Sequence, residues 1–193
     1  SKAGNEDSHR ATLAYLFDDK TTKLKSSYGT GFRFPSIYEL YFVDYANGQS
    51  IGSVKAEKSR SFDIGFEKSF IDWGLNLDLS YFNLKYFDPL EAWAINNAAG
   101  VAYTTQNSPG SIRSQGLEIS SKWEVNKFLN FDLNYTYTST YDGAEQDDPD
   151  ILATTTNAQM VRVPRHFLNL GTKLLFLNKN LDLTLNTKWS DTM

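Results

Sequence analysis

The feature that most constrains the fold is a strict alternation of apolar and polar residues in several long segments of the chain. Between residues 129 and 138, Leu, Phe and Tyr occupy every odd position and Asn, Asp and Thr occupy every even position. The same pattern covers 75–81 and 181–186. Successive side chains of a β-strand point to opposite faces of a sheet, so a period of two predicts strands with one apolar and one polar face.

We predict an all-β fold, an antiparallel meander of eight long strands. The strands are expected at 10–18, 22–33, 57–69, 74–90, 101–125, 128–142, 158–176 and 180–190. We expect a bulge to interrupt the fifth strand near Asn107-Ser108-Pro109-Gly110, because proline donates no hydrogen bond to a neighbouring strand.

The links between the predicted strands alternate in length. Short links are expected at 18–20, 70–72, 125–127 and 177–179, and long links near 34–56, 91–100 and 143–157. In an antiparallel meander this alternation places every long link at the same end of the sheet. Short turns at one end and long loops at the other are the layout of an outer-membrane β-barrel.

Strand length and aromatic placement favour a barrel over a soluble β-sandwich, which would also show alternation. Strands of soluble sheets usually have about five or six residues, whereas a tilted membrane-spanning strand needs about 9–11. Aromatic residues gather near the short links and again towards the long ones, as in the interfacial girdles of barrels. The two groups are Phe17, Phe66, Phe70, Trp73, Trp123, Phe128 and Phe176, and Tyr28, Phe32, Tyr81, Tyr137 and Tyr141.

Composition argues against several classes of function. The 193 residues include 19 basic and 23 acidic side chains, and a formal net charge of −4 does not suit a protein that grips nucleic acid. No cysteine is present to form a disulfide, a thiolate zinc site or a nucleophile. His9 and His166 lack a catalytic sequence setting, and no glycine-rich loop precedes a helix. We therefore expect no enzyme, no cofactor and no resident metal.

Four motifs stand out along the chain: Tyr-Gly-Thr-Gly-Phe-Arg-Phe-Pro-Ser at 28–36 with Tyr-Glu-Leu-Tyr at 38–41, Val-Lys-Ala-Glu-Lys-Ser at 54–59, Gly-Leu-Glu at 116–118, and Val-Pro-Arg-His at 163–166. In order and spacing they resemble motifs of TonB-dependent outer-membrane receptors, in a cobalamin-receptor-like form. The chain departs from the family pattern at Phe34, where a small residue or proline is usual, and at Ala56, where proline is usual.

The resemblance implies that residues 1–193 are a partial barrel domain, about eight strands from the second half of a barrel of about 22 strands. The plug, the early strands and the last strands are expected to be absent. The parent protein would lie in the outer membrane of a Gram-negative bacterium and import cobalamin or a ferric siderophore. Its implied partners are its own plug domain, TonB, outer-membrane lipid and the ligand. The alternatives are a passive porin or adhesin-type barrel and a soluble β-sandwich binding module.

Strand parity assigns a set of charged residues to the barrel lumen, where we expect them to face the plug or, alternatively, water. They are Lys23, Lys25, Arg33, Glu57, Asp63, Glu67, Glu118, Lys122 and Lys173. Gly65 and Gly116 share this face, and we expect them either to admit a plug backbone or to bend their strands. Arg33 and Glu57 lie where adjacent strands meet their shared outer loop, so a charge pair is expected to fix the loop base.

The long links are the expected place for ligand capture, with ordinary exposed loops as the alternative. Aromatic rings offer flat contact area and amides offer hydrogen bonds, which suits a large ligand. The candidate residues are Tyr41, Phe42, Asp44, Tyr45 and Asn47 in the first loop and Trp93, Asn96 and Asn97 in the second. The acidic stretch at 147–150 fits no calcium-loop spacing, so we expect it to be solvated.

Overall fold

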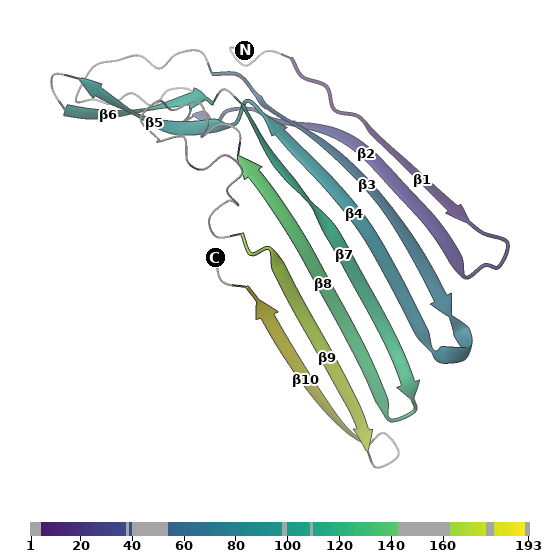
Figure 1. The fold of residues 1–193 in the computed structure, drawn as a ribbon. Helices are drawn as coiled ribbons and strands as arrows, with labels where there is room; N and C mark the ends of the chain where they lie inside the picture. The colour runs from purple at the N-terminus through teal and green to yellow at the C-terminus, as the bar shows by residue number, and fades with distance from the viewer. Residues whose placement is uncertain are drawn as a thin grey trace.

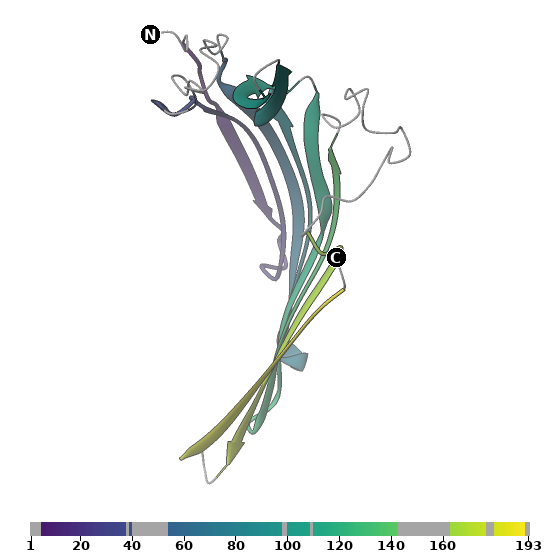
Figure 2. The same cartoon turned by 90° about the vertical axis from the view of Figure 1, so that its left-hand side faces the viewer.

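One curved sheet of eight antiparallel strands dominates the computed structural model, which describes residues 5–37, 39, 54–97, 100–108, 110–142, 163–176 and 180–191 (Figures 1 and 2). The strands run across the sheet as β1 (Arg10–Leu16), β2 (Thr22–Arg33), β3 (Glu57–Phe70), β4 (Leu75–Phe87), β7 (Ser111–Asn126), β8 (Leu129–Asp142), β9 (His166–Phe176) and β10 (Leu181–Ser190). The predicted all-β antiparallel meander is therefore confirmed.

Among the described residues, a hairpin of β5 (Leu90–Asn97) and β6 (Gly100–Asn107) lies outside this sheet and forms a sheet of its own. The prediction of one broken strand over 101–125 was wrong, because β6 and β7 belong to different sheets. The predicted long link near 91–100 lies within the longer connection from β4 to β7, which contains the β5–β6 hairpin. β6 pairs antiparallel with β5 instead of continuing into the large sheet, and β7 begins as a separate strand at Ser111. Gly110 lies at this junction with a φ of 140°, a backbone conformation open mainly to glycine.

The ninth strand also begins later than predicted. We expected a strand over 158–176, but β9 starts at His166. Residues 158–162 lie outside the described residues, and 163–165 precede the strand without joining it. Pro164 explains the late start, because it donates no hydrogen bond to the ladder.

The short links from β1 to β2, from β3 to β4 and from β7 to β8 form tight connections at the lower end of Figure 1. Between β1 and β2, the Asp19 carboxylate accepts hydrogen bonds from the backbone N–H groups of Thr21 and Thr22, at 3.0 and 2.9 Å. Between β3 and β4, a 3₁₀ helix η1 (Ile71–Trp73) ends at Gly74, whose φ of 60° suits glycine. The predicted turn at 70–72 is thus one turn of helix.

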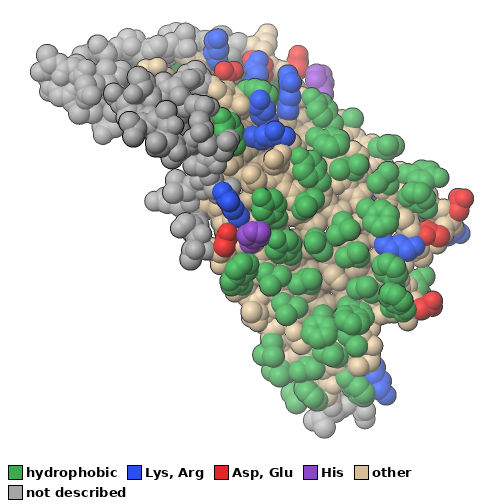
Figure 3. Space-filling view, in the orientation of Figure 1, with side chains coloured by type: hydrophobic (Ala, Val, Ile, Leu, Met, Phe, Trp, Pro, Cys, Tyr) green, Lys and Arg blue, Asp and Glu red, His purple; other side chains and the backbone are tan. Residues whose placement is uncertain are grey.

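The two faces of the sheet differ in character, as the period of two predicts. Cross-strand partners share a face, so Phe66 lies beside Leu79, and Leu117 lies beside Tyr81 and Tyr137. These residues belong to the apolar face, which points to the viewer in Figure 3 as a broad green surface. Exposed side chains on it include Leu24, Tyr28, Phe62, Ile64, Phe66, Leu79, Leu117, Trp123, Phe176 and Leu183.

The described part of the chain has almost no hydrophobic core of its own. Val54 and Ala56 are its only buried hydrophobic residues, with 4% and 1% exposure. A soluble β-sandwich would bury its alternating apolar residues against a second sheet, so this arrangement argues against that alternative. An apolar surface as continuous as this face is expected to meet lipid or protein rather than water. Among the described residues, no helix combines the length and hydropathy needed to cross a bilayer.

Candidate functional site: the loop base and the polar face

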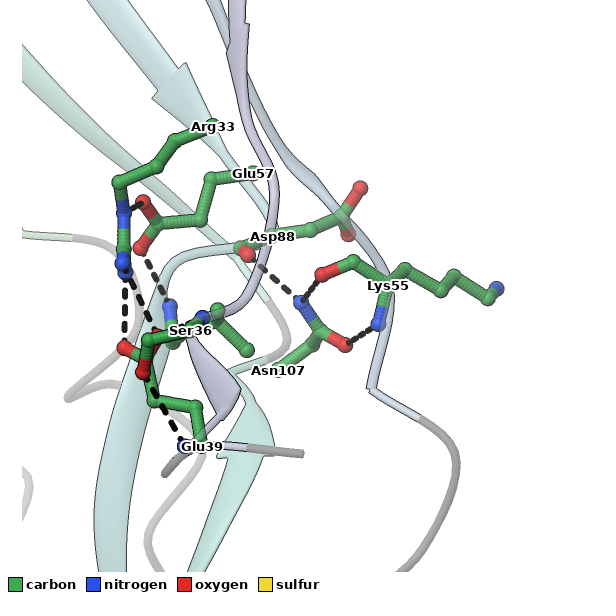
Figure 4. Close-up of polar contacts among 8 residues, drawn as sticks. Arg33, Ser36, Glu39, Lys55, Glu57, Asp88 and Asn107 are labelled. Carbon is green, nitrogen blue, oxygen red and sulfur yellow. Dashed lines mark hydrogen bonds and ion pairs between the residues drawn. The ribbon is translucent and has the colours of Figure 1, made fainter. Parts of the chain in front are cut away.

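Arg33 and Glu57 form the expected charge pair at the base of the first long link. Arg33 ends β2, Glu57 begins β3, and the two residues are direct cross-strand partners. Arg33 Nε donates to Glu57 Oε2 at 2.5 Å. The two terminal nitrogens of the same guanidinium donate to the two carboxylate oxygens of Glu39, each at 3.0 Å (Figure 4). Arg33 therefore holds two carboxylates through its planar fork of donors.

Ser36 and Glu39 add a reciprocal pair of hydrogen bonds at the start of the same link. The Ser36 backbone N–H donates to the Glu39 carboxylate at 2.6 Å, and the Glu39 backbone N–H donates to Ser36 Oγ at 3.1 Å. This is the capping box of a helix start. The hydrogen bonds from Arg33 and then from the Ser36 backbone lower the pKa of Glu39 to about 2. Glu39 is therefore ionised at any ordinary pH.

The second long excursion of the chain is fixed to the same place. Glu57 Oε1 accepts a hydrogen bond from the backbone N–H of Leu90, the first residue of β5, at 2.7 Å. Asn107, at the end of β6, accepts from the Lys55 backbone N–H at 2.7 Å. The Asn107 side-chain amide also donates to the backbone oxygens of Lys55 and Asp88, at 3.1 and 2.9 Å (Figure 4). These contacts join the ends of β2, β4 and β6 to the starts of β3 and β5.

We call Arg33, Ser36, Glu39, Glu57 and Asn107 the loop-base cluster. The two buried apolar residues, Val54 and Ala56, lie in the segment just before Glu57, and Ser108 beside Asn107 is 1% exposed. The cluster thus sits where the described part of the chain is most tightly packed. Its chemistry suits a rigid anchor, because the guanidinium of Arg33 pairs with the carboxylates of Glu39 and Glu57. Beside the cluster, Ser108 Oγ is buried without a hydrogen-bond partner among the described residues.

A second polar network lies on the other face of the sheet, which we call the polar face. Lys23 Nζ and Lys25 Nζ bind the two oxygens of Glu67 at 2.9 and 2.8 Å. Lys25 also reaches Asp78 Oδ2 at 2.6 Å. The parity rule placed Lys23, Lys25 and Glu67 on one face, and the structure brings them into contact. Asp78 was missed, although it alternates with leucines and so carries the same parity signal.

Glycines on the polar face make room for side chains of neighbouring strands of the same sheet. A Cβ atom on Gly65 would lie 2.6 Å from Lys25 Cε, so the glycine lets Lys25 cross the strand to Asp78. A Cβ atom on Gly116 would lie 2.7 Å from the ring of Phe82 and 1.9 Å from the Tyr137 carbonyl oxygen. At these two positions the space that we expected a plug backbone to enter is filled by the wall's own atoms.

A shallow groove of about 360 Å³ opens on the polar face beside this network. Its lining includes Glu67, Asn76, Asp78, Ser120, Lys122 and Asn134. Asp78 Oδ1 is buried there without a hydrogen-bond partner among the described residues, and so is Asn169 Oδ1 on the same face. Buried polar atoms normally have partners, so the groove presents acceptors that a neighbouring polar segment could satisfy.

The remaining predicted lumen residues also lie on the polar face. Asp63 accepts a hydrogen bond from Ser27 Oγ at 2.8 Å, and Lys173 pairs with Asp182 at 3.2 Å. Glu118 is exposed opposite Ser80. Whether any of these residues contacts a plug stays a prediction.

The predicted ligand-capturing residues are placed only in part. Tyr41, Phe42, Asp44, Tyr45 and Asn47 lie outside the described residues. Trp93, Asn96 and Asn97 belong to β5 rather than to an irregular loop. Their role in binding stays a prediction. Asn107 was noted in the sequence only as part of a strand break, and its side chain proves to join two loop bases.

Comparison with known structures places this wall in larger barrels. A mutant ferric enterobactin receptor of Pseudomonas aeruginosa has a TM-score of 0.73 and 18% identity, over 98% of this chain and 28% of that chain. A hemophore receptor double mutant of Serratia marcescens has a TM-score of 0.71 and 18% identity, over 96% and 32%. A siderophore receptor of Acinetobacter baumannii has a TM-score of 0.68 and 20% identity, over 96% and 29%.

These likenesses show the fold, and the chain spans less than a third of the length of each structure. Among curated proteins, none matches the chain in sequence. The family model described as TonB dependent receptor-like, beta-barrel matches residues 1–192. That family consists of transporters of the Gram-negative outer membrane and not of enzymes. The chain therefore belongs to the β-barrels of TonB-dependent receptors.

Proposed function

We propose that the parent protein imports a large, scarce solute across the outer membrane with energy transduced by TonB. In this proposal, the described wall anchors the outer loops that capture the solute. The loop-base cluster carries the argument, because Arg33, Glu57 and Asn107 fix both ends of two long excursions to the same rim. A loop held at both ends can present a binding surface without the ordering cost of a free segment.

We further propose an iron chelate as the solute, with cobalamin as the alternative. The similar structures include receptors described for ferric enterobactin, for a siderophore and for a heme-carrying hemophore. These descriptions name ferric enterobactin, a siderophore and heme, which supports an iron chelate over a corrinoid. The identities of 18–20% support the choice only at the level of the solute class.

The polar face is proposed as the seat of the plug domain. The unpartnered Asp78 Oδ1 and the Lys122 side chain line one groove, so a plug segment carrying an N–H donor and a carboxylate would complement it. Charge pairs such as Lys25 with Glu67 give the wall a polar lining against which a plug can move without exposing apolar surface.

Equilibrium binding by the purified full-length parent tests the proposed solute. A ferric catecholate siderophore, haem and cobalamin are titrated separately onto the wild type and onto Arg33→Met. Tight binding of an iron chelate, weakened in Arg33→Met, is the expected result. Lys55→Met is the matched control, because Lys55 contributes only its backbone to the loop base. Tight binding of cobalamin alone would replace the iron chelate with cobalamin as the proposed solute. Binding of none of the three would reject both proposed solutes.

Dependence on TonB separates active import from a passive barrel. Uptake of the identified ligand is expected to vanish in cells that lack TonB while surface binding persists. Uptake that is unchanged in those cells would identify a passive porin and overturn the proposed mechanism.

A further inference from the structure

Three cations stand side by side on the apolar face, just above its apolar residues. Arg60 on β3 is the cross-strand partner of Lys85 on β4, and Lys85 is the partner of Arg113 on β7. Cross-strand partners share a face, so the three side chains leave the sheet on the side that carries Phe62 and Leu117. We call Arg60, Lys85 and Arg113 the basic row. In Figure 3, blue side chains gather at the upper edge of the green surface.

The basic row lacks carboxylate partners within the described part of the chain. Lys23, Lys25, Arg33, Lys58, Lys68 and Lys173 all form ion pairs there, but none of the three row members does. Within the described residues, the row stacks two of its cations on the Phe87 ring, whose centroid lies 5.2 Å from Arg60 Cζ and 5.0 Å from Lys85 Nζ. Like charges placed directly opposite each other destabilise a sheet. An anion between them would remove that repulsion.

The position of the row identifies the anion's surroundings. Along β4 the apolar face passes from Leu79 through Tyr81 and Asn83 to Lys85, and along β7 from Leu117 through Gln115 to Arg113. Strands rise about 3.3 Å per residue and tilt by about 40°, so Lys85 stands ~10 Å above Tyr81 along the membrane normal. Tyrosine marks the membrane interface in such barrels. The basic row is therefore at the level of lipid head groups, at the long-loop and hence outward-facing end.

Polar groups directly below the row are already oriented. Asn83 Nδ2 donates to Tyr81 Oη at 3.1 Å and to Gln115 Oε1 at 3.4 Å, and Tyr81 Oη lies 3.2 Å from Gln115 Oε1. This network holds two amides and a phenol between the hydrocarbon level and the cations. Such a gradient matches a lipid whose acyl chains, polar linkage and phosphate follow one another in the same order.

We propose that the basic row binds the phosphate groups of an anionic, phosphorylated lipid in the outward-facing leaflet. Two guanidinium groups flanking an ammonium match phosphate oxygens in charge and in donor geometry. The site lies on the outside of the barrel and does not depend on which solute is imported. Its role would be to fix the rim of the barrel, just below the loop base, in the head-group layer.

The test titrates the full-length parent, in neutral detergent, with lipid A carrying two phosphates and with the same lipid stripped of phosphate. Bound lipid is counted by native mass spectrometry. The phosphorylated lipid is expected to bind at least about tenfold more tightly, since each charge-assisted hydrogen bond contributes substantially. Added salt should reduce the difference. Equal binding of the two lipids would overturn the proposal, and this comparison needs no variant.

A triple variant assigns the effect to the row. Arg60→Gln/Lys85→Gln/Arg113→Gln is expected to lose the preference for phosphate. Lys20→Gln/Lys127→Gln/Lys188→Gln removes the same charge elsewhere and should keep it. Folding of each is checked by the heat-dependent shift of barrel proteins on gels. A folded triple variant that retains the preference, or full competition by inorganic phosphate, would contradict a lipid site.

Discussion

The two faces of the eight-stranded sheet share one hydrogen-bonded ladder but are stabilised in opposite ways. On the apolar face, Phe66, Leu79 and Leu117 lie on adjacent strands and stay exposed to the surroundings. On the polar face, Lys25 binds Glu67 and Asp78. The stability of the apolar face therefore depends on what covers it, whereas the polar face pairs charged residues within the sheet.

The comparison shows where this wall obtains its stability. A sheet that buries only Val54 and Ala56 among its described hydrophobic residues cannot rely on a core. Lipid must cover one face, and the polar face pairs several of its charged residues across strands, including Lys25 with Glu67 and Asp78. Substitutions of the same kind should then cost very different amounts on the two faces.

The largest effect is expected from a charge in the apolar band. Leu133 lies near the middle of the apolar run of β8, opposite Leu170. Leu133→Arg should destabilise the full-length parent by about 2–4 kcal/mol, the cost of an arginine at the bilayer midplane. Unfolding by urea in lipid vesicles measures the change. Thr136→Arg is the matched control on the polar face, where Glu118 is the cross-strand partner, and equal costs would erase the distinction between the faces.

A smaller effect is expected at the rim. Arg33→Met leaves Glu39 and Glu57 without their shared cation and should cost about 1–3 kcal/mol of local stability. The amide of Leu90, which binds Glu57, should then exchange its hydrogen faster. Hydrogen exchange measures the rate at the Leu90 amide, and Lys55→Met is the control. Unchanged protection of Leu90 would show that the loop-base cluster does not hold β5.

The polar network should respond more weakly still. Lys25→Met removes the cation that pairs with Asp78 among the described residues, and the side chains involved are about one-third exposed. Partly exposed ion pairs contribute up to about 1 kcal/mol, so the loss should not exceed that. The double variant Lys25→Met/Asp78→Asn should recover part of it in the same urea measurement. A loss as large as that of Leu133→Arg would show that the polar face is more than a lining.

The smallest effect is a pH dependence confined to the loop base. The pKa of Glu39 is lowered to about 2 by Arg33 and Ser36, so its contribution is complete above the ordinary pKa of 4.5 and is lost as pH falls towards 2. The protection of the Ser36 amide, corrected for intrinsic exchange, should fall over this interval. Glu39→Gln should remove the dependence. Loss of protection well above pH 5 would assign it to another group.

The alternation of residues was enough to predict most of this wall. The segments 22–33, 57–69, 128–142 and 180–190 match β2, β3, β8 and β10 closely, because one lipid-facing and one polar face leave a strong period-two signal. The pairing of Arg33 with Glu57 followed from their places at the two ends of one loop.

Other features depend on contacts that alternation does not encode. Val101 and Tyr103 continue the pattern towards β7, so the reversal of β6 onto β5 was hidden. Lys25 on β2 reaches Asp78 on β4 across the intervening strand β3, where Gly65 leaves room for its side chain. Glu39 did carry a local signal, since Ser36-Ile37-Tyr38-Glu39 has the spacing of a capping box.

Accessibility along β8 tests the central claim most directly. The chain contains no cysteine, so single cysteines can be placed from 129 to 137 in the full-length parent, provided its other parts are also free of cysteine. Spin labels at these positions, in lipid vesicles, report collisions with oxygen and with a water-soluble nickel complex. The account predicts high oxygen access at every odd position and low oxygen access at every even one. Equal access at both, or the opposite alternation, would contradict a barrel wall with these two faces.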